Sequence, residues 1–146
     1  MADHQHELLG WMDAFAEAVR TIDFDRGIEL FDPGAVGFGT RADVADGLGC
    51  LVDEQWRFIW PHTERFRFIE GSVSTGMGGD GLLAWTMGLW ESSIRETGPE
   101  GRRRGRATIL LRRRETSEPW RAFHTHFSRL PSESDASERT WSKTAS

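Results

Sequence analysis

The stretch that determines the fold is Trp120-Arg121-Ala122-Phe123-His124-Thr125-His126-Phe127-Ser128. It is rich in aromatic residues and follows the turn residues 117–119, which is typical of a strand entered from a hairpin. Side chains alternate between the faces of a strand, so His124 and His126 share one face, about 7 Å apart, opposite Phe123 and Phe127. If the phenylalanines point into the core, both histidines lie on the outer face, where subunits would pair. A ligand pocket and a subunit interface therefore both stay open for the histidines.

Further strand signals precede this stretch. Residues 35–40 indicate a short strand, residues 66–74 one bent strand, and residues 82–94 a long strand that is followed after a turn at 98–101 by a strand at 107–111. The last two are apolar on both faces, whereas a strand with one face in water should alternate. We therefore expect one face of the sheet to meet helices and the other to meet a second copy, as a homodimer.

Helical spacing dominates the first half of the chain. Apolar residues recur at intervals of three and four over residues 7–19 and 46–60, and Asp23 can cap a short helix through Leu30 that ends at the turn Asp32-Pro33-Gly34. Helices followed by consecutive hairpins indicate an α+β fold, with a sharply curved antiparallel sheet packed on N-terminal helices. We expect one domain over residues 1–131 and a disordered tail over 132–146, which is rich in Ser, Thr and charge.

Composition narrows the functional classes. Among 146 residues there are seven Trp and nine Phe, which suit the wall of a pocket as well as a core, and no Tyr. The net charge of −5 disfavours nucleic acid or an anionic membrane as partner. The single cysteine, Cys50, can form no internal disulfide and is expected to be a small buried hydrophobe. With no apolar run long enough to span a membrane and no signal-like start, we expect a cytoplasmic protein.

The terminal strand also resembles a known family. A Trp leads into a His-x-His-x-Ser run at residues 120–128, as in SnoaL-like proteins of the nuclear transport factor 2-like superfamily, and the association domain of calcium/calmodulin-dependent kinase shares that ending. The segments 30–36 and 38–40 fit as well, so the resemblance covers residues 7–131. It implies a cone-shaped fold around an apolar pocket. It is weak for activity, because the superfamily includes isomerases, cyclases, epoxide hydrolases and non-catalytic assembly domains.

The catalytic patterns of two branches of that superfamily are absent. The Tyr of the steroid isomerases would fall at Phe15, which cannot donate a hydrogen bond, and their Asp base would fall near Gly39, which cannot move a proton. The Asp-Arg-Asp arrangement of limonene epoxide hydrolase has no clear counterpart. Whether the chain is an enzyme therefore stays open.

Several aromatic and basic residues are candidates for the pocket. Trp56 and Trp60 are four apart on a helix and would stack, whereas Trp85 and Trp90 are five apart on a strand and must face opposite sides. The arginines at 102–104, 106 and 112–114 are read mainly as a solvated strand edge. One of them, Arg106 or Arg112, could point inward and bind a carboxylate on a small acidic ligand.

The prediction is a SnoaL-like protein that binds a small apolar molecule, and that could act as an isomerase, cyclase or hydrolase. The alternative is a non-catalytic association domain. The resemblance centres on His126, which is therefore the expected pocket member and candidate catalytic residue. The candidate ligand-binding residues are Phe15, Phe38, Thr40, Trp56, Trp60, Trp85, Arg106 and His124. The two histidines could supply metal ligands, but a third would have to come from a distant carboxylate or from His62, and there is no other cluster of ligand-type residues, so no metal and no cofactor are expected.

Overall fold

The computed structural model describes residues 2–131. The expected tail at 132–146 lies outside these residues. The first half contains α1 (Ala2–Thr21), α2 (Phe24–Glu29), β1 (Phe31–Phe38), β2 (Ala45–Asp46) and a helical segment made of α3 (Leu48–Leu51), a π-helical turn (Val52–Trp56), α4 (Arg57–Ile59) and a 3₁₀ turn (Trp60–His62). The second half contains β3 (Thr63–Phe68), β4 (Ser74–Met77), β5 (Leu83–Ile94), β6 (Gly98–Arg112) and β7 (Arg121–Arg129).

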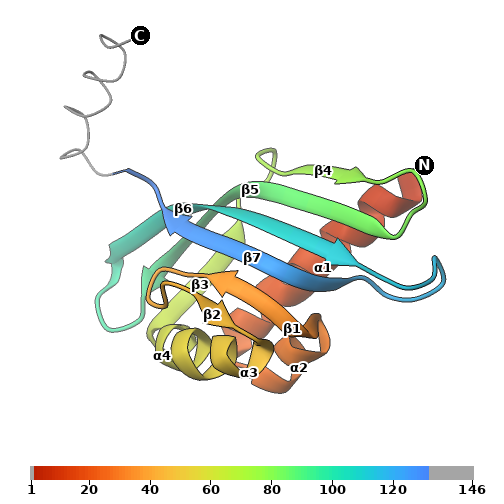
Figure 1. The fold of residues 1–146 in the computed structure, drawn as a ribbon. Helices are drawn as coiled ribbons and strands as arrows, with labels where there is room; N and C mark the ends of the chain where they lie inside the picture. The colour runs from red at the N-terminus through yellow and green to blue at the C-terminus, as the bar shows by residue number, and fades with distance from the viewer. Residues whose placement is uncertain (1, 132–146) are drawn as a thin grey trace, which may run out of the picture.

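The strands form one curved, open sheet with the helices gathered on one side (Figure 1). Its order is β2-β1-β7-β6-β5-β3, and β4 also pairs with β5. This confirms the α+β class and the packing of the sheet on helices. The sheet is mixed rather than wholly antiparallel, because β1 runs parallel to β7. These two strands come from opposite ends of the domain, so no hairpin forces them to be antiparallel.

Two expected turns are wrong. Asp32, Pro33 and Gly34 belong to β1, at the point where its register against β7 shifts between Phe31 and Val36. Proline has no N–H for a regular ladder and is tolerated at such an irregularity. The residues around Gly98 open β6 instead of separating two strands, so the turn lies earlier.

The expected bent strand at 66–74 is two strands. β3 ends at Phe68, a turn at Gly71, whose φ is +84°, interrupts the strand, and β4 starts at Ser74 and runs in the same direction. Both pair antiparallel with β5, β3 near Ile94 and β4 near Trp85. The long strand β5 therefore holds two short ones along the same edge.

The helix α1 confirms the amphipathic pattern. Its buried stripe includes Leu8, Trp11, Met12, Phe15, Ala16, Ala18 and Val19. The next helix, α2, begins as expected at Asp23, whose carboxylate accepts a hydrogen bond from the backbone N–H of Arg26 at 3.0 Å. Within residues 2–131, no helix is both long and apolar enough to cross a membrane.

The helical segment 48–62 is irregular in the region that faces the sheet. In its π turn, the backbone N–H of Arg57 donates to the carbonyl oxygen of Val52, five residues earlier. Such turns insert one residue into an α-helix and are frequent at functional sites. This turn carries Gln55 and Trp56, which are both buried.

Candidate functional site

A small cavity lies between the helices and the inner face of the sheet. Its volume is about 60 Å³. Most of the residues that line it are aromatic or aliphatic: Phe15, Val19, Phe38, Leu51, Trp56, Ile59, Trp60, Phe66, Trp90 and Phe127. The remaining lining residues are Gly39, Thr40, Gln55, Thr63, Arg103 and Thr125.

The wall is a packed aromatic cluster centred on Phe15 of α1. The centroid of its ring lies 5.9 Å from that of Trp60, 5.8 Å from that of Phe127 and 6.1 Å from that of Trp56. Trp56 and Trp60 stack with centroids 4.5 Å apart, which confirms the expectation from their spacing. Aromatic pairs of this kind stabilise by about 0.5–1.5 kcal/mol beyond their area burial, so the packing of these rings favours the folded state.

Gln55 fixes the loop 39–42 at one border of the cavity. Its Oε1 accepts hydrogen bonds from the backbone N–H groups of Arg41 at 3.0 Å and Ala42 at 2.8 Å, and its Nε2 donates to Thr40 Oγ1 at 3.2 Å. The loop is closed by a bond from the N–H of Gly39 to the carbonyl oxygen of Ala42. A Cβ at Gly39 would lie 2.5 Å from Gln55 Cδ, so only glycine allows this approach. Gln55 was not predicted as a site residue, because the sequence does not indicate which groups its side-chain amide would bond.

Arg103 on β6 is the ionisable side chain of the lining. Its Nη2 donates to Thr63 Oγ1 at 2.9 Å, and its buried Nε has no hydrogen-bond partner. Burial lowers the pKa of the Arg103 guanidinium, and repulsion by Arg129 lowers it further. From the sequence, the expected inward arginine was Arg106 or Arg112. Instead, Arg106 is exposed and Arg112 pairs with Asp32.

The alternation of inward and outward residues along β6 could have identified Arg103 as an inward side chain. The buried residues Ala107, Ile109 and Leu111 alternate along β6 and mark its inner face. Position 103 is an even number of residues from these and therefore lies on the same face, whereas positions 106 and 112 lie on the opposite face.

The structure brings five of the predicted ligand-binding residues to the cavity: Phe15, Phe38, Thr40, Trp56 and Trp60. The other four predicted site residues do not line it: Trp85, Arg106, His124 and His126.

The two histidines lie on the outer face of β7. Thr125 and Phe127 line the cavity, so the alternate positions point away from it. His124 Nδ1 is 2.7 Å from the carbonyl oxygen of Val36, and His126 is exposed. Both rings meet the ring of Phe38 edge-on, with centroids 4.8 and 5.4 Å away. The expectation that His126 lines the pocket is therefore wrong. Of the two positions left open by the sequence, the pocket and the outer face, both histidines occupy the outer face.

The two tryptophans of β5 face opposite sides as expected, but the inner one is Trp90. Trp90 lines the cavity and is 4% exposed, and its Nε1 donates to the carbonyl oxygen of Arg106 at 3.2 Å. Trp85 is 36% exposed on the outer face, which it shares with the exposed Leu83 and Met87, two residues before and after it on β5. This placement corrects Trp85 as a ligand-binding residue, and Trp90 takes its position in the wall.

The lining limits the chemistry that the cavity can support. Among the described residues that line it there is no carboxylate, imidazole or thiol, so its own side chains offer no general acid or base near neutral pH. Over residues 2–131, no group of three or more His, Cys, Asp and Glu side chains is placed to hold a metal ion. The arrangement is suited to enclosing an apolar group beside one cation.

A family model described as the SnoaL-like domain matches residues 9–133. The chain belongs to the SnoaL-like family. Comparison with curated proteins gave no match.

Solved structures show the same fold. This SnoaL-like chain is 20% identical to a nuclear transport factor 2-like protein of unknown function from Pseudomonas putida, with a TM-score of 0.74 and coverage of 91% of each chain. A proposed dehydratase from Streptomyces avermitilis has 21% identity and a TM-score of 0.73, over 90% of this chain and 100% of its own. A proposed calcium/calmodulin-dependent protein kinase II association domain from Xanthomonas campestris has 16% identity and a TM-score of 0.70, over 86% of each chain. At these identities the likeness shows the fold alone.

Proposed function

We propose that this SnoaL-like domain binds a small, largely apolar molecule in the cavity between its helices and its sheet. The observation that carries the proposal is the aromatic wall around Phe15, with Trp56, Trp60 and Trp90 all lining one space. Concave apolar sites with a few polar groups are the usual form of a small-molecule site. We propose binding rather than turnover, because the described lining has no acid or base for proton transfer.

The volume sets the size of the ligand. The cavity of about 60 Å³ is less than half the roughly 150 Å³ of an engineered apolar cavity that binds benzene. The expected ligand therefore has only a few non-hydrogen atoms, and a larger one requires the aromatic wall to move.

Tryptophan fluorescence tests this proposal, because three tryptophans line the cavity. We expect saturable changes with short neutral probes such as 1-butanol, and with xenon. Ile59→Phe adds bulk at the cavity and should abolish the response, whereas Ile28→Phe, a matched change on α2 at a side chain 38% exposed, should keep it. A protein that gives no saturable change with any of these probes contradicts the proposal.

A second candidate function, association with another copy, is favoured by the outer face of β5. Leu83, Trp85 and Met87 alternate along it and are 46%, 36% and 44% exposed. Leu110 is the partner of Trp85 on β6, so this apolar surface continues onto the neighbouring strand, with His124 beside Leu110 on β7. Exposed apolar patches of this kind mark interaction sites, and we propose a homodimer through this face.

Light scattering tests the association. Trp85→Arg places a charge at the centre of the outer face and should convert the dimer to a monomer. Phe58→Arg, at a side chain 50% exposed on α4, is the matched control and should remain a dimer. A wild-type protein with the mass of a monomer at micromolar concentration would contradict this proposal. We also propose a cytoplasmic setting, since the single cysteine offers no internal disulfide for an oxidising compartment.

A further inference from the structure

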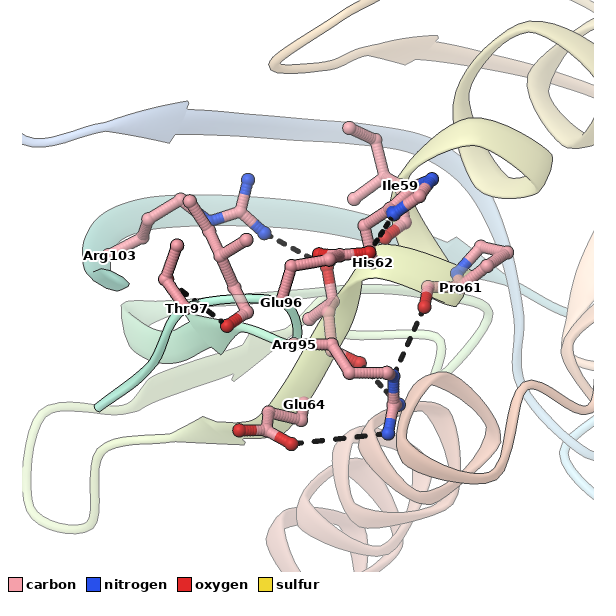
Figure 2. A network of polar contacts seen from close by, with 10 residues as sticks. Ile59, Pro61, His62, Glu64, Arg95, Glu96, Thr97 and Arg103 are labelled. Atoms are coloured by element: carbon pink, nitrogen blue, oxygen red, sulfur yellow. Dashed lines mark hydrogen bonds and ion pairs between the residues drawn. The ribbon is translucent and has the colours of Figure 1, made fainter. Parts of the chain in front are cut away.

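Arg103 is held in a fixed position at one end of the cavity. It lies on β6, where its register partner on β5 is Ser92. Its Nη2 donates to Thr63 Oγ1 at 2.9 Å, and that hydroxyl donates to the carbonyl oxygen of Ile59 at 2.7 Å. Figure 2 shows Arg103 reaching toward the segment of chain around Ile59 and His62. The chain of hydrogen bonds orients the guanidinium beside the space that the aromatic rings enclose.

Within the described residues, this guanidinium has no carboxylate partner. The acidic side chains of the surrounding network are committed elsewhere: Glu64 pairs with Arg95 at 3.9 Å, and Glu96 bonds to His62 Nδ1 (Figure 2). No ion pair of residues 2–131 includes Arg103, and its Nε is buried without a hydrogen-bond acceptor.

A partly buried cation without an anion is unfavourable. Removing charge from water costs free energy unless an opposite charge or hydrogen bonds replace the lost hydration. Burial lowers the pKa of Arg103 for the same reason, with repulsion by Arg129 in addition, yet an arginine stays protonated in proteins. The cavity therefore presents a positive charge that a bound anion would neutralise.

We propose that the ligand of this cavity is a small monocarboxylate with a short apolar chain, whose carboxylate binds Arg103 and whose chain lies among the aromatic rings. This inference rests on the proposed function of the same cavity. A carboxylate fits better than a phosphate, because the lining supplies one cation, and a phosphate carries more charge and needs more donors. The small cavity volume restricts the chain to a few carbons.

A comparison of butanoate with butanamide tests this assignment on the wild-type protein. The two have nearly the same shape and differ in charge. A charge-assisted hydrogen bond contributes about 1.5–3 kcal/mol, and each 1.4 kcal/mol corresponds to a factor of ten in affinity. We expect butanoate to bind at least tenfold more tightly than butanamide, measured by calorimetry and by tryptophan fluorescence at neutral pH.

Variants of the arginines locate the effect. Arg103→Gln should remove the preference for butanoate while butanamide binds as before, and Arg103→Lys should keep part of the preference. Arg102→Gln is the matched control, because Arg102 is the exposed neighbour on the same strand, and it should leave both affinities unchanged. Thermal melting checks that each variant is folded, and the wild-type comparison stands even where Arg103→Gln fails to fold.

The outcomes separate this inference from the function on which it rests. Equal affinities for butanoate and butanamide would overturn the carboxylate assignment and leave the apolar cavity in place. Equal binding of butanoate and inorganic sulfate would also overturn it, because the site would then accept any anion. A preference for butanoate that survives in Arg103→Gln would remove Arg103 from the site. Failure of every probe, neutral or charged, would contradict the proposed function itself.

Discussion

Replacing Gln55 with methionine should destabilise the loop that borders the cavity. Methionine is of similar size but cannot accept the hydrogen bonds that Gln55 Oε1 accepts from the N–H groups of Arg41 and Ala42. The Ala42 bond is buried, so its unpaired N–H costs about 1–3 kcal/mol, and the partly exposed Arg41 bond adds about 0.5–1.5 kcal/mol. We expect a loss of roughly 2–4 kcal/mol in the free energy of unfolding. At about 3 °C per kcal/mol for a domain of this size, the melting temperature should fall by roughly 6–12 °C.

Thr40→Val is the matched control for this change. It removes the bond between Gln55 Nε2 and Thr40 Oγ1 at 3.2 Å and leaves both backbone N–H groups paired. Because Thr40 is exposed, we expect a loss below about 1 kcal/mol. Urea unfolding of both variants measures the difference. If Gln55→Met costs no more than Thr40→Val, the loop does not depend on Gln55 and the reasoning is refuted.

Three further predictions concern the packing around Gly27, the ionisation of Glu91 and truncation after Pro131. A Cβ at Gly27 would lie 2.7 Å from Trp60 Cη2, so Gly27→Ala should lower the stability by about 1–3 kcal/mol, whereas Gly10→Ala, with open space around it, should be neutral or stabilising in thermal melts. The pKa of Glu91 is lowered, chiefly by its hydrogen bond with Arg67, so its stabilisation is present above its ordinary pKa and is lost as the pH falls through the folded-state value. Urea unfolding should therefore show Glu91→Gln less stable than wild type at neutral pH, and the difference should shrink as the pH falls below the ordinary pKa of a glutamate; a difference that stays constant into acid would contradict this. Truncation after Pro131 should leave the melting temperature unchanged, because the core described by the structure reaches no further than Phe127, and a fall of several degrees would show that the tail contributes.

The sequence predicted those elements whose pattern is local. The buried stripe of α1 includes Leu8, Trp11 and Phe15, the spacing that predicted it, and β5 and β7 begin within one residue of the expected strands. The parallel pairing of β1 with β7 was missed, because two strands from opposite ends of the chain leave no hairpin signal between them. Pro33 was read as a turn for a similar reason, since the register shift that accommodates it depends on the partner strand.

The site was predicted in part. Residues of the helical side, such as Phe15, Trp56 and Trp60, were identified because large aromatic side chains on a buried helix face must reach the core. On the strands, a residue lines the cavity only if its side chain lies on the inner face. His126 was assigned from a resemblance and Trp85 as one of two tryptophans on opposite faces, whereas the alternation of buried residues along β6 places Arg103 inward, and Phe127 of β7 lines the cavity. Local motifs therefore did not show which residues of each strand face the core.

The π turn at Val52–Trp56 has a consequence for comparing this chain with its relatives. A π turn holds one residue more than an α-helical turn, so a relative with a regular helix in this place has one residue fewer between the same two ends. An alignment that forbids gaps inside helices would then shift every position on one side of the turn by one. Trp56 and Trp60 would be matched to residues on a different face of the relative's helix. Superposition of backbones, with a single-residue gap allowed at this turn, is the comparison that identifies equivalent cavity residues.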